Sequence, residues 1–299
     1  MKLSDQRGNV SFKKLIDRDY GVLNLAEYRE RIETFITESQ YKQTVQFALQ
    51  QKLFIKYGAS PQLQSFFNMV NTRSNQYMTN TLRAAQYYIN SHNDNADVRG
   101  TLLKGLGDNC YEYAVNDIFD GNSPSDRVVD PGFTFYEDKY WMAYLDKLDA
   151  NTRSNVMNMR AQMVLRFPLT NIPPNMWQAA ITWDVNFFGW RLDAVAFDRN
   201  MYRHVPGTLL FAGVYGPKDY HFYRFEPEFG LWTHKRGPTP VICTDESDEL
   251  IFDPAQCNRG TMYPYMMGYF VLSPMNNTAA NTYSSVTITT NAPTTITFR

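Results

Sequence analysis

The stretch Tyr220–Pro238, YHFYRFEPEFGLWTHKRGP, decides how the second half of the chain folds. An aromatic, alternating run opens at His221, and a second short run ends at His234, so each run is typical of a β-strand. Pro227 and Gly230 lie between the two runs and indicate a turn. The stretch therefore predicts a β-hairpin that brings the two imidazoles near one edge of a sheet.

Apolar residues have mostly helical spacing in the chain before the hairpin and mostly strand-like spacing around it. Apolar residues with helical spacing predict helices at 25–36, 45–57, 61–71 and 78–91. Further strands are predicted at 179–183, 194–197, 208–215, 241–242 and 267–272, with a strand pair in the Thr-rich tail, 285–298. Because helices come first and strands follow, we expect an α+β protein with a helical domain, 1–98, and an antiparallel sheet domain, 99–299.

Composition narrows the function classes. The chain has 299 residues and a net charge of −1, which argues against electrostatic attraction to nucleic acid. No run is long and apolar enough for a membrane span, and the first residues lack the apolar core of a signal peptide. We therefore expect a cytoplasmic protein, or one that is exported or virion-associated without a signal peptide. Three cysteines are too few for a disulfide framework, so none is expected. The sequence has no Cys-x-x-Cys, so a structural zinc site is not expected either.

One cysteine has a setting that suggests chemistry. Cys110 lies in the sequence GDNCYEYA, where Asp108 or Asn109 is suited to cap a helix that runs to about Phe119. A thiol in the first turn of a helix is near free N–H groups and the positive end of the helix dipole, which favour the thiolate. The N–H of Cys110 itself is suited to donate to an oxyanion. Cys110 is therefore a candidate nucleophile.

A thiolate nucleophile needs an imidazole within hydrogen-bond reach and a third group that orients the imidazole. His221 is the candidate base. His234 on the neighbouring strand and Asp219, just before the base, are both suited to orient it. The sequence leaves open which of the two has this role.

The order of these residues resembles the papain-like cysteine peptidases of the NlpC branch. The cysteine helix, the DYHFYR strand (219–224), the WTHK stretch (232–235) and the GYF strand (268–270) carry the resemblance, which covers roughly residues 105–275. It implies a papain-like domain with Cys110 as nucleophile, His221 as base and His234 as orienting residue. The implied reaction is hydrolysis of a peptide or amide through an acyl-enzyme, without a cofactor. The helical region would then dock a protein partner or restrict access to the site.

Other interpretations use the same residues. Cys110 is also suited to be a small buried apolar residue, and the two histidines to be satisfied members of a sheet. A metal site built from His221, His234, Glu226 and Glu228 would need carboxylates that a polar turn normally leaves in water, so no metal is expected. The alternative function is a non-catalytic structural or assembly protein, for example a viral virion component, with a papain-like fold whose chemistry is lost.

Overall fold

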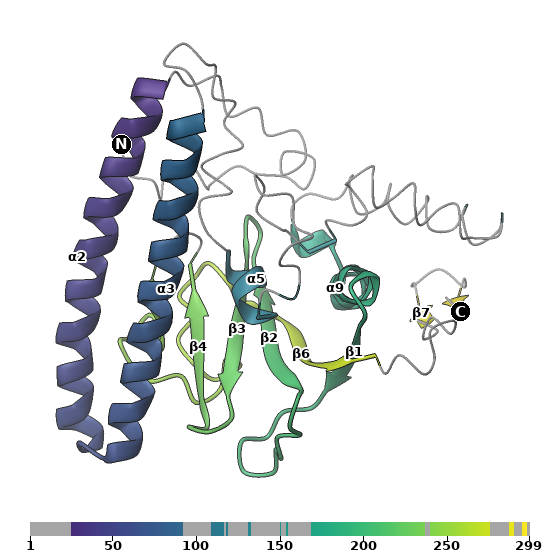
Figure 1. Ribbon diagram of the computed structural model, residues 1–299. Coiled ribbons are helices and arrows are strands. Elements are labelled where there is room, and N and C mark those ends of the chain that lie inside the picture. The colour runs from purple at the N-terminus through teal and green to yellow at the C-terminus, as the bar shows by residue number, and fades with distance from the viewer. Residues whose placement is uncertain are drawn as a thin grey trace. The chain divides into compact units, whose positions relative to one another are not determined.

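The computed structural model describes residues 25–91, 109–116, 118, 131–132, 150, 154, 169–236, 240–275, 287–289 and 295–297. Helices precede a six-stranded antiparallel sheet, so the α+β class is confirmed (Figure 1). The chain divides into two compact units. One contains the described residues of 130–221 and 260–299, and the other contains the described residues of 18–129 and 222–259.

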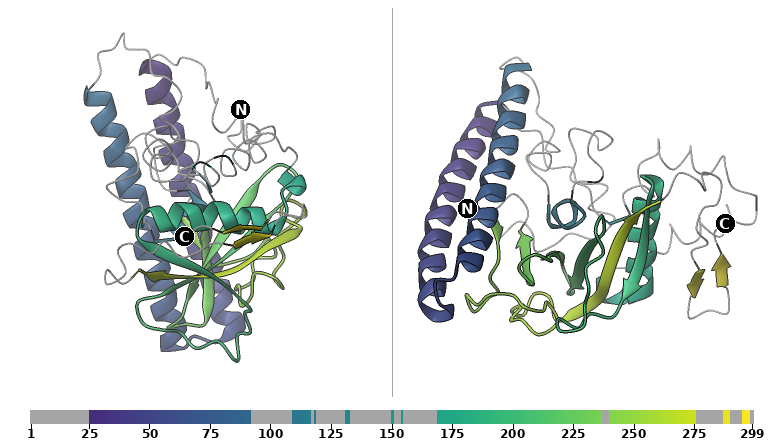
Figure 2. Two further views of the ribbon diagram at one scale, coloured as in Figure 1. Left: turned by 90° about the vertical axis from the view of Figure 1, so that its right-hand side faces the viewer. Right: turned by 60° about the horizontal axis from the view of Figure 1, so that its bottom comes forward.

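Two long helices begin the described part of the chain. They are α2, Leu25–Tyr57, and α3, Pro61–Ser91, and they lie side by side in each view (Figures 1 and 2). Gly58, at φ +84°, ends α2, and the hydroxyl of Ser60 accepts the N–H of Leu63 at the start of α3. Two helices are therefore present where four are predicted. The segments that separate the predicted helices, 37–44 and 72–77, contain no glycine or proline, so each pair continues as one helix.

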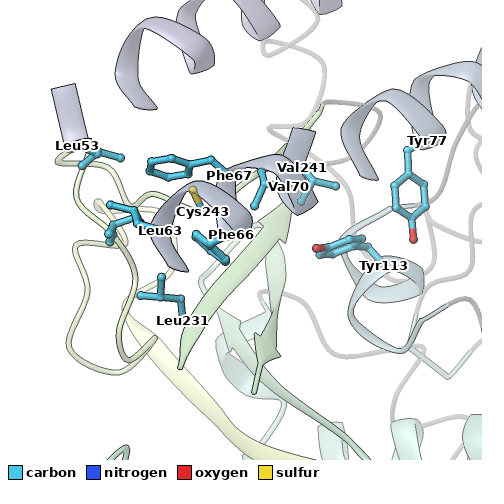
Figure 3. Close-up of a cluster of buried hydrophobic side chains, with 11 residues drawn as sticks. Leu53, Leu63, Phe66, Phe67, Val70, Tyr77, Tyr113, Leu231, Val241 and Cys243 are labelled. Carbon is cyan, nitrogen blue, oxygen red and sulfur yellow. The ribbon is translucent and has the colours of Figure 1, made fainter. Parts of the chain in front are cut away.

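These helices share a hydrophobic core with the strands of their own unit (Figure 3). Phe66 and Phe67 of α3 are completely buried and lie close to Cys243, while Tyr77 packs edge-on against Tyr113 at a ring distance of 5.5 Å. The members of the cluster are Leu53, Leu63, Phe66, Phe67, Val70, Tyr77, Tyr113, Leu231, Val241, Cys243 and Leu250. Whether residues 1–98 also form a domain of their own stays a prediction, and the predicted boundary at 98/99 lies outside the described residues.

The sheet has the strand order β1-β6-β2-β3-β4-β5. Its strands are β1 Trp190–Val195, β2 Leu209–Tyr215, β3 Tyr220–Glu226, β4 Leu231–Lys235, β5 Val241–Ile242 and β6 Tyr265–Pro274. The predicted hairpin is confirmed: β3 and β4 pair antiparallel, with Tyr223 opposite His234. The N–H groups of Phe229 and Gly230 both donate to the carbonyl of Glu226, and these bonds close the turn.

The predicted strand at 179–183 is wrong, because these residues lie inside helix α9, Pro174–Phe187. An apolar run of this length does not distinguish a buried strand from a buried helix segment, and Pro173-Pro174 provides a helix start just before it. Trp177, in the first turn of α9, is completely buried and packs its ring against Tyr215 and Tyr220.

The remaining predicted strands are found with small shifts in their ends. The predicted strand at 194–197 begins earlier, as β1, and the tail pair is present as two short antiparallel strands, β7 Thr287–Thr289 and β8 Thr295–Thr297. None of the described helices is long and apolar enough to cross a membrane.

Candidate functional site

Cys110 is the first residue of helix α5, Cys110–Ala114, as the sequence predicts. The N-cap is Asn109, one of the two residues predicted for that role. Its side-chain oxygen accepts the N–H groups of Tyr111 at 2.8 Å and Glu112 at 3.0 Å, and the Glu112 carboxylate accepts the Asn109 N–H at 3.0 Å. This reciprocal capping box explains why so short a helix begins here.

The helix is much shorter than predicted. It ends at Ala114 rather than near Phe119, because Val115 leaves the helical conformation and Asn116 adopts a left-handed φ of +57°. The amide oxygen of Asn116 then accepts Arg224 Nη1 at 2.6 Å, so the residue that ends the helix also ties it to β3. Asparagine adopts this conformation more readily than most other residues.

Helix α5 packs on one face of the β3–β4 hairpin. The ring of Tyr111 lies 5.1 Å from that of Phe222, and the hydroxyl of Tyr113 lies 2.7 Å from Thr233 Oγ1. Cys110 itself is 6% exposed. The thiol is therefore part of a packed helix start and is nearly covered.

A buried ion network continues this face towards α3. The carboxylate of Glu226 pairs with the guanidinium of Arg73 and accepts the hydroxyl of Thr233 at 2.8 Å, while Arg224 Nε lies 3.6 Å from it. Burial, and then the neighbouring Glu226 carboxylate, raise the pKa of Tyr113 to about 12. Glu226 therefore belongs to a structural network of α3, α5 and the hairpin. Within the described residues, no group of three or more His, Cys, Asp or Glu side chains is arranged to hold a metal ion.

His234 lies on the other face of the hairpin. Successive side chains of a strand point to opposite faces, so His234 points away from the side on which its neighbour Thr233 contacts α5. It is 1% exposed, its Nε2 lies 2.9 Å from the Thr244 carbonyl, and its ring lies 4.9 Å from that of Tyr223. The structure thus places His234 and helix α5 on opposite sides of β4.

The environment of His234 fixes its charge state. Burial, and then the neighbouring positive charge of Arg236, lower the pKa of His234 to about 3. The ring is therefore neutral near pH 7. Because a carbonyl only accepts, Nε2 carries the proton and donates it to the Thr244 oxygen.

His221 has a different neighbourhood. It is buried, and its ring stacks on Tyr263 at 5.4 Å with an angle of 26° between the planes. The hydroxyl of Tyr263 donates to Asp219 Oδ2 at 2.8 Å, and Asp219 Oδ1 accepts the N–H of Tyr220 at 2.9 Å. Asp219, the alternative orienting residue, is thus linked to His221 through Tyr263. Cys110 and His221 belong to different compact units, so their pairing stays a prediction.

Sequence reasoning missed the residues that surround the two histidines. The sequence places Tyr223 in a predicted strand but does not indicate that its ring contacts His234 or that it hydrogen-bonds with the Cys257 thiol. Burial, and then the carboxylate of Asp245, raise the pKa of Cys257 to about 11. The alternation of β3 could have shown which face of the strand Tyr223 occupies. Cys257 and Tyr263 lie in loops, whose sequences have no periodicity from which a position could be predicted.

Comparisons with known proteins cover little of the chain. Over 66 residues it is 39% identical to insoluble matrix shell protein 1 of Ruditapes philippinarum. This stretch is 22% of the chain and 43% of that protein, so the chain spans less than half the length of the curated relative it matches. No family model and no solved structure matches the chain.

Proposed function

We propose that this chain is a non-catalytic structural or assembly protein, built on a papain-like framework whose chemistry is lost. The observation that carries the proposal is the position of His234 and the hydrogen bond that its ring makes. An imidazole that orients a catalytic base has to hydrogen-bond to that base, whereas Nε2 of His234 donates to a main-chain carbonyl, on the side of β4 away from α5. It acts instead as a buried link between β4 and the segment that contains Thr244.

Two further observations support a structural role. Cys110 is almost completely covered, so its thiol is poorly placed to reach a substrate carbonyl. The partial match is to a protein named insoluble matrix shell protein 1, a name that is compatible with this proposal.

The second candidate is a cysteine hydrolase that acts on a peptide or amide. It is favoured by the position of Cys110 as the first residue of a capped helix. In this reaction the thiolate attacks the carbonyl carbon and forms a thioester, while the imidazolium of His221 gives its proton to the leaving amine. Water, deprotonated by the same imidazole, then releases the acid. His234 or Asp219 would orient that imidazole.

The rate of Cys110 alkylation by iodoacetamide, followed against pH, separates the two functions. The experiment is best done with Cys257→Ser, since Cys257 is the least buried of the three thiols, and with peptide mass mapping to assign the label. A structural cysteine reacts slowly, and His221→Ala leaves its rate unchanged. Fast labelling below neutral pH that His221→Ala abolishes would overturn the structural proposal in favour of the hydrolase. His204→Ala, a change at an exposed histidine, is the matched control.

A further inference from the structure

Strand β1 forms one edge of the sheet. In the strand order it has β6 as its neighbour, and among the described residues no other strand pairs with it (Figure 1). The N–H of Met275 donates to the carbonyl of Gly189, just before β1, so the main-chain groups of Gly189 face β6. These groups turn to alternate sides along a strand. The residues of β1 whose N–H and C=O groups face away from β6 are therefore Trp190, Leu192 and Ala194.

The side chains along this edge leave it open to a further strand. Ala194 is exposed, and the side chains of Arg191 and Asp193 are 55% and 47% exposed. The strand contains neither proline nor lysine, the residues that commonly prevent an edge from pairing. Its two charges lie two residues apart, on one face, and pair with each other at 2.8 Å. The edge therefore carries balanced charge and main-chain groups that are suited to bind another strand.

We propose that β1 pairs antiparallel with β1 of a second copy of this chain, with Leu192 opposite Leu192. Trp190 then lies opposite Ala194 of the second copy, and the outward N–H and C=O groups of both strands meet as hydrogen-bonded pairs. Arg191 lies opposite Asp193 of the second copy, twice by symmetry. These two contacts occupy non-hydrogen-bonded positions, where opposite side chains are closest.

Charge selects both the register and the second copy. Because outward groups have to meet outward groups, an antiparallel partner can slide only in steps of two residues. One such step sets Arg191 opposite itself, and the step in the other direction sets Asp193 opposite itself. A parallel pair in register also places each charge beside its own counterpart. The sequence Arg191-Leu192-Asp193 is thus complementary to its own reverse, which identifies a second β1 as the partner.

The short overlap predicts a weak, reversible dimer. The strand has six residues, and a pair of this length buries less than the roughly 1,200 Å² above which stable interfaces lie. The pairs of Arg191 with Asp193 stay in contact with water, so they select the register more than they add affinity. We therefore expect dimers to become visible at concentrations on the order of 100 μM.

Sedimentation of the full chain over a concentration series tests the proposal with charge reversals. Arg191→Asp turns two attractive contacts into two repulsive ones, and Asp193→Arg does the same with the opposite sign, so each is expected to weaken dimerisation more than about tenfold. When the two variants are mixed, every contact again joins opposite charges, and the mixture is expected to dimerise. Lys218→Asp is the matched control, since it makes the same charge change at an exposed residue of the same compact unit. It should dimerise as wild type does.

Ala194→Pro tests the main chain independently of charge. It removes an N–H that faces the second copy, while the neighbouring residues that bond to β6 keep theirs. Dimerisation should be lost, whereas Ala194→Thr, which keeps the N–H, should retain it. Circular dichroism checks that all the variants stay folded.

Four results would overturn the pairing. They are a wild type that stays monomeric throughout, charge reversals that dimerise as well as Lys218→Asp, a mixture of the two reversals that dimerises no better than its components, and an Ala194→Pro variant that dimerises like Ala194→Thr. The inference goes beyond the proposed function and depends only on β1. Its failure leaves the alkylation of Cys110, and with it the proposed function, unaffected.

Discussion

The buried imidazole of His234 makes the protein sensitive to mild acid. In the folded state its pKa is about 3, whereas a histidine in an unfolded chain has a pKa of about 6.5. Between these values the unfolded state binds a proton that the folded state excludes, so the free energy of unfolding falls as the pH falls. The stability that the neutral His234 contributes is therefore fully present above a pH of about 6.5, the pKa of histidine in the unfolded chain, and is lost progressively as the pH falls below it.

The size of the effect follows from the two pKa values. Within the window each pH unit changes the free energy of unfolding by about 1.4 kcal/mol. Because the onset near the unfolded pKa is gradual, lowering the pH from about 7.5 to about 5 removes roughly 2 kcal/mol. This is a large part of the 5–15 kcal/mol that typically separates folded from unfolded domains, so it is measurable by urea unfolding followed through the five tryptophans.

His234→Gln removes the proton binding and keeps a side-chain N–H that is suited to donate to the Thr244 carbonyl. We expect wild type and the exposed-histidine control His204→Gln to lose stability in parallel between the two pH values. His234→Gln should lose about 2 kcal/mol less over the same interval, whatever its stability at the higher pH. His221 is the same in all three proteins, so it does not affect the difference between them. If His234→Gln lost as much stability as wild type, the reasoning about this buried neutral ring would be wrong.

Three further predictions concern stability, and each is checked by urea unfolding at neutral pH. Phe66→Ala should cost about 3–5 kcal/mol because it empties a fully buried site, whereas Phe47→Ala, at an exposed site, should change stability by no more than about 0.5 kcal/mol; equal effects would contradict the position of the core. Glu226→Gln should cost about 3 kcal/mol or more, since Arg73 loses its buried counter-charge, and adding Arg73→Met should recover part of the loss; no recovery would show that the pair is not coupled. Asn109→Ala should cost about 1 kcal/mol through loss of the cap, and an unchanged midpoint would mean that the capping box does not stabilise α5.

Short sequence motifs predicted the turns and helix starts, because neighbouring residues determine these features. The turn chemistry of Pro227 and Gly230 predicted the hairpin, and the helical spacing of apolar residues from position 61 predicted the start of α3. The run at 179–183 was assigned to the wrong class because a short apolar run has no period that separates a buried strand from a buried helix. The end of α5 was missed because the left-handed conformation of Asn116 has no strong signal in a single sequence.

The candidate site was predictable only in part, for a related reason. The sequence located Cys110 at a helix start and both histidines on strands, but it could not show which face of the hairpin the helix would cover. That choice depends on long-range contacts, such as Tyr111 with Phe222 and Tyr113 with Thr233.

A shift of one residue in a strand moves a side chain to the opposite face of a sheet. The order Cys110, His221, His234 along the chain is therefore compatible with either orientation of His234 on β4. It either joins a site beneath the cysteine helix or becomes a buried link on the far side. In this protein β4 turns Thr233 towards α5 and His234 towards the Thr244 carbonyl, so the same motif that suggests a catalytic triad instead places an imidazole where burial keeps it neutral. The acid sensitivity of folding and the reactivity of Cys110 thus report on the two sides of one hairpin, and the two measurements together test which outcome this chain has adopted.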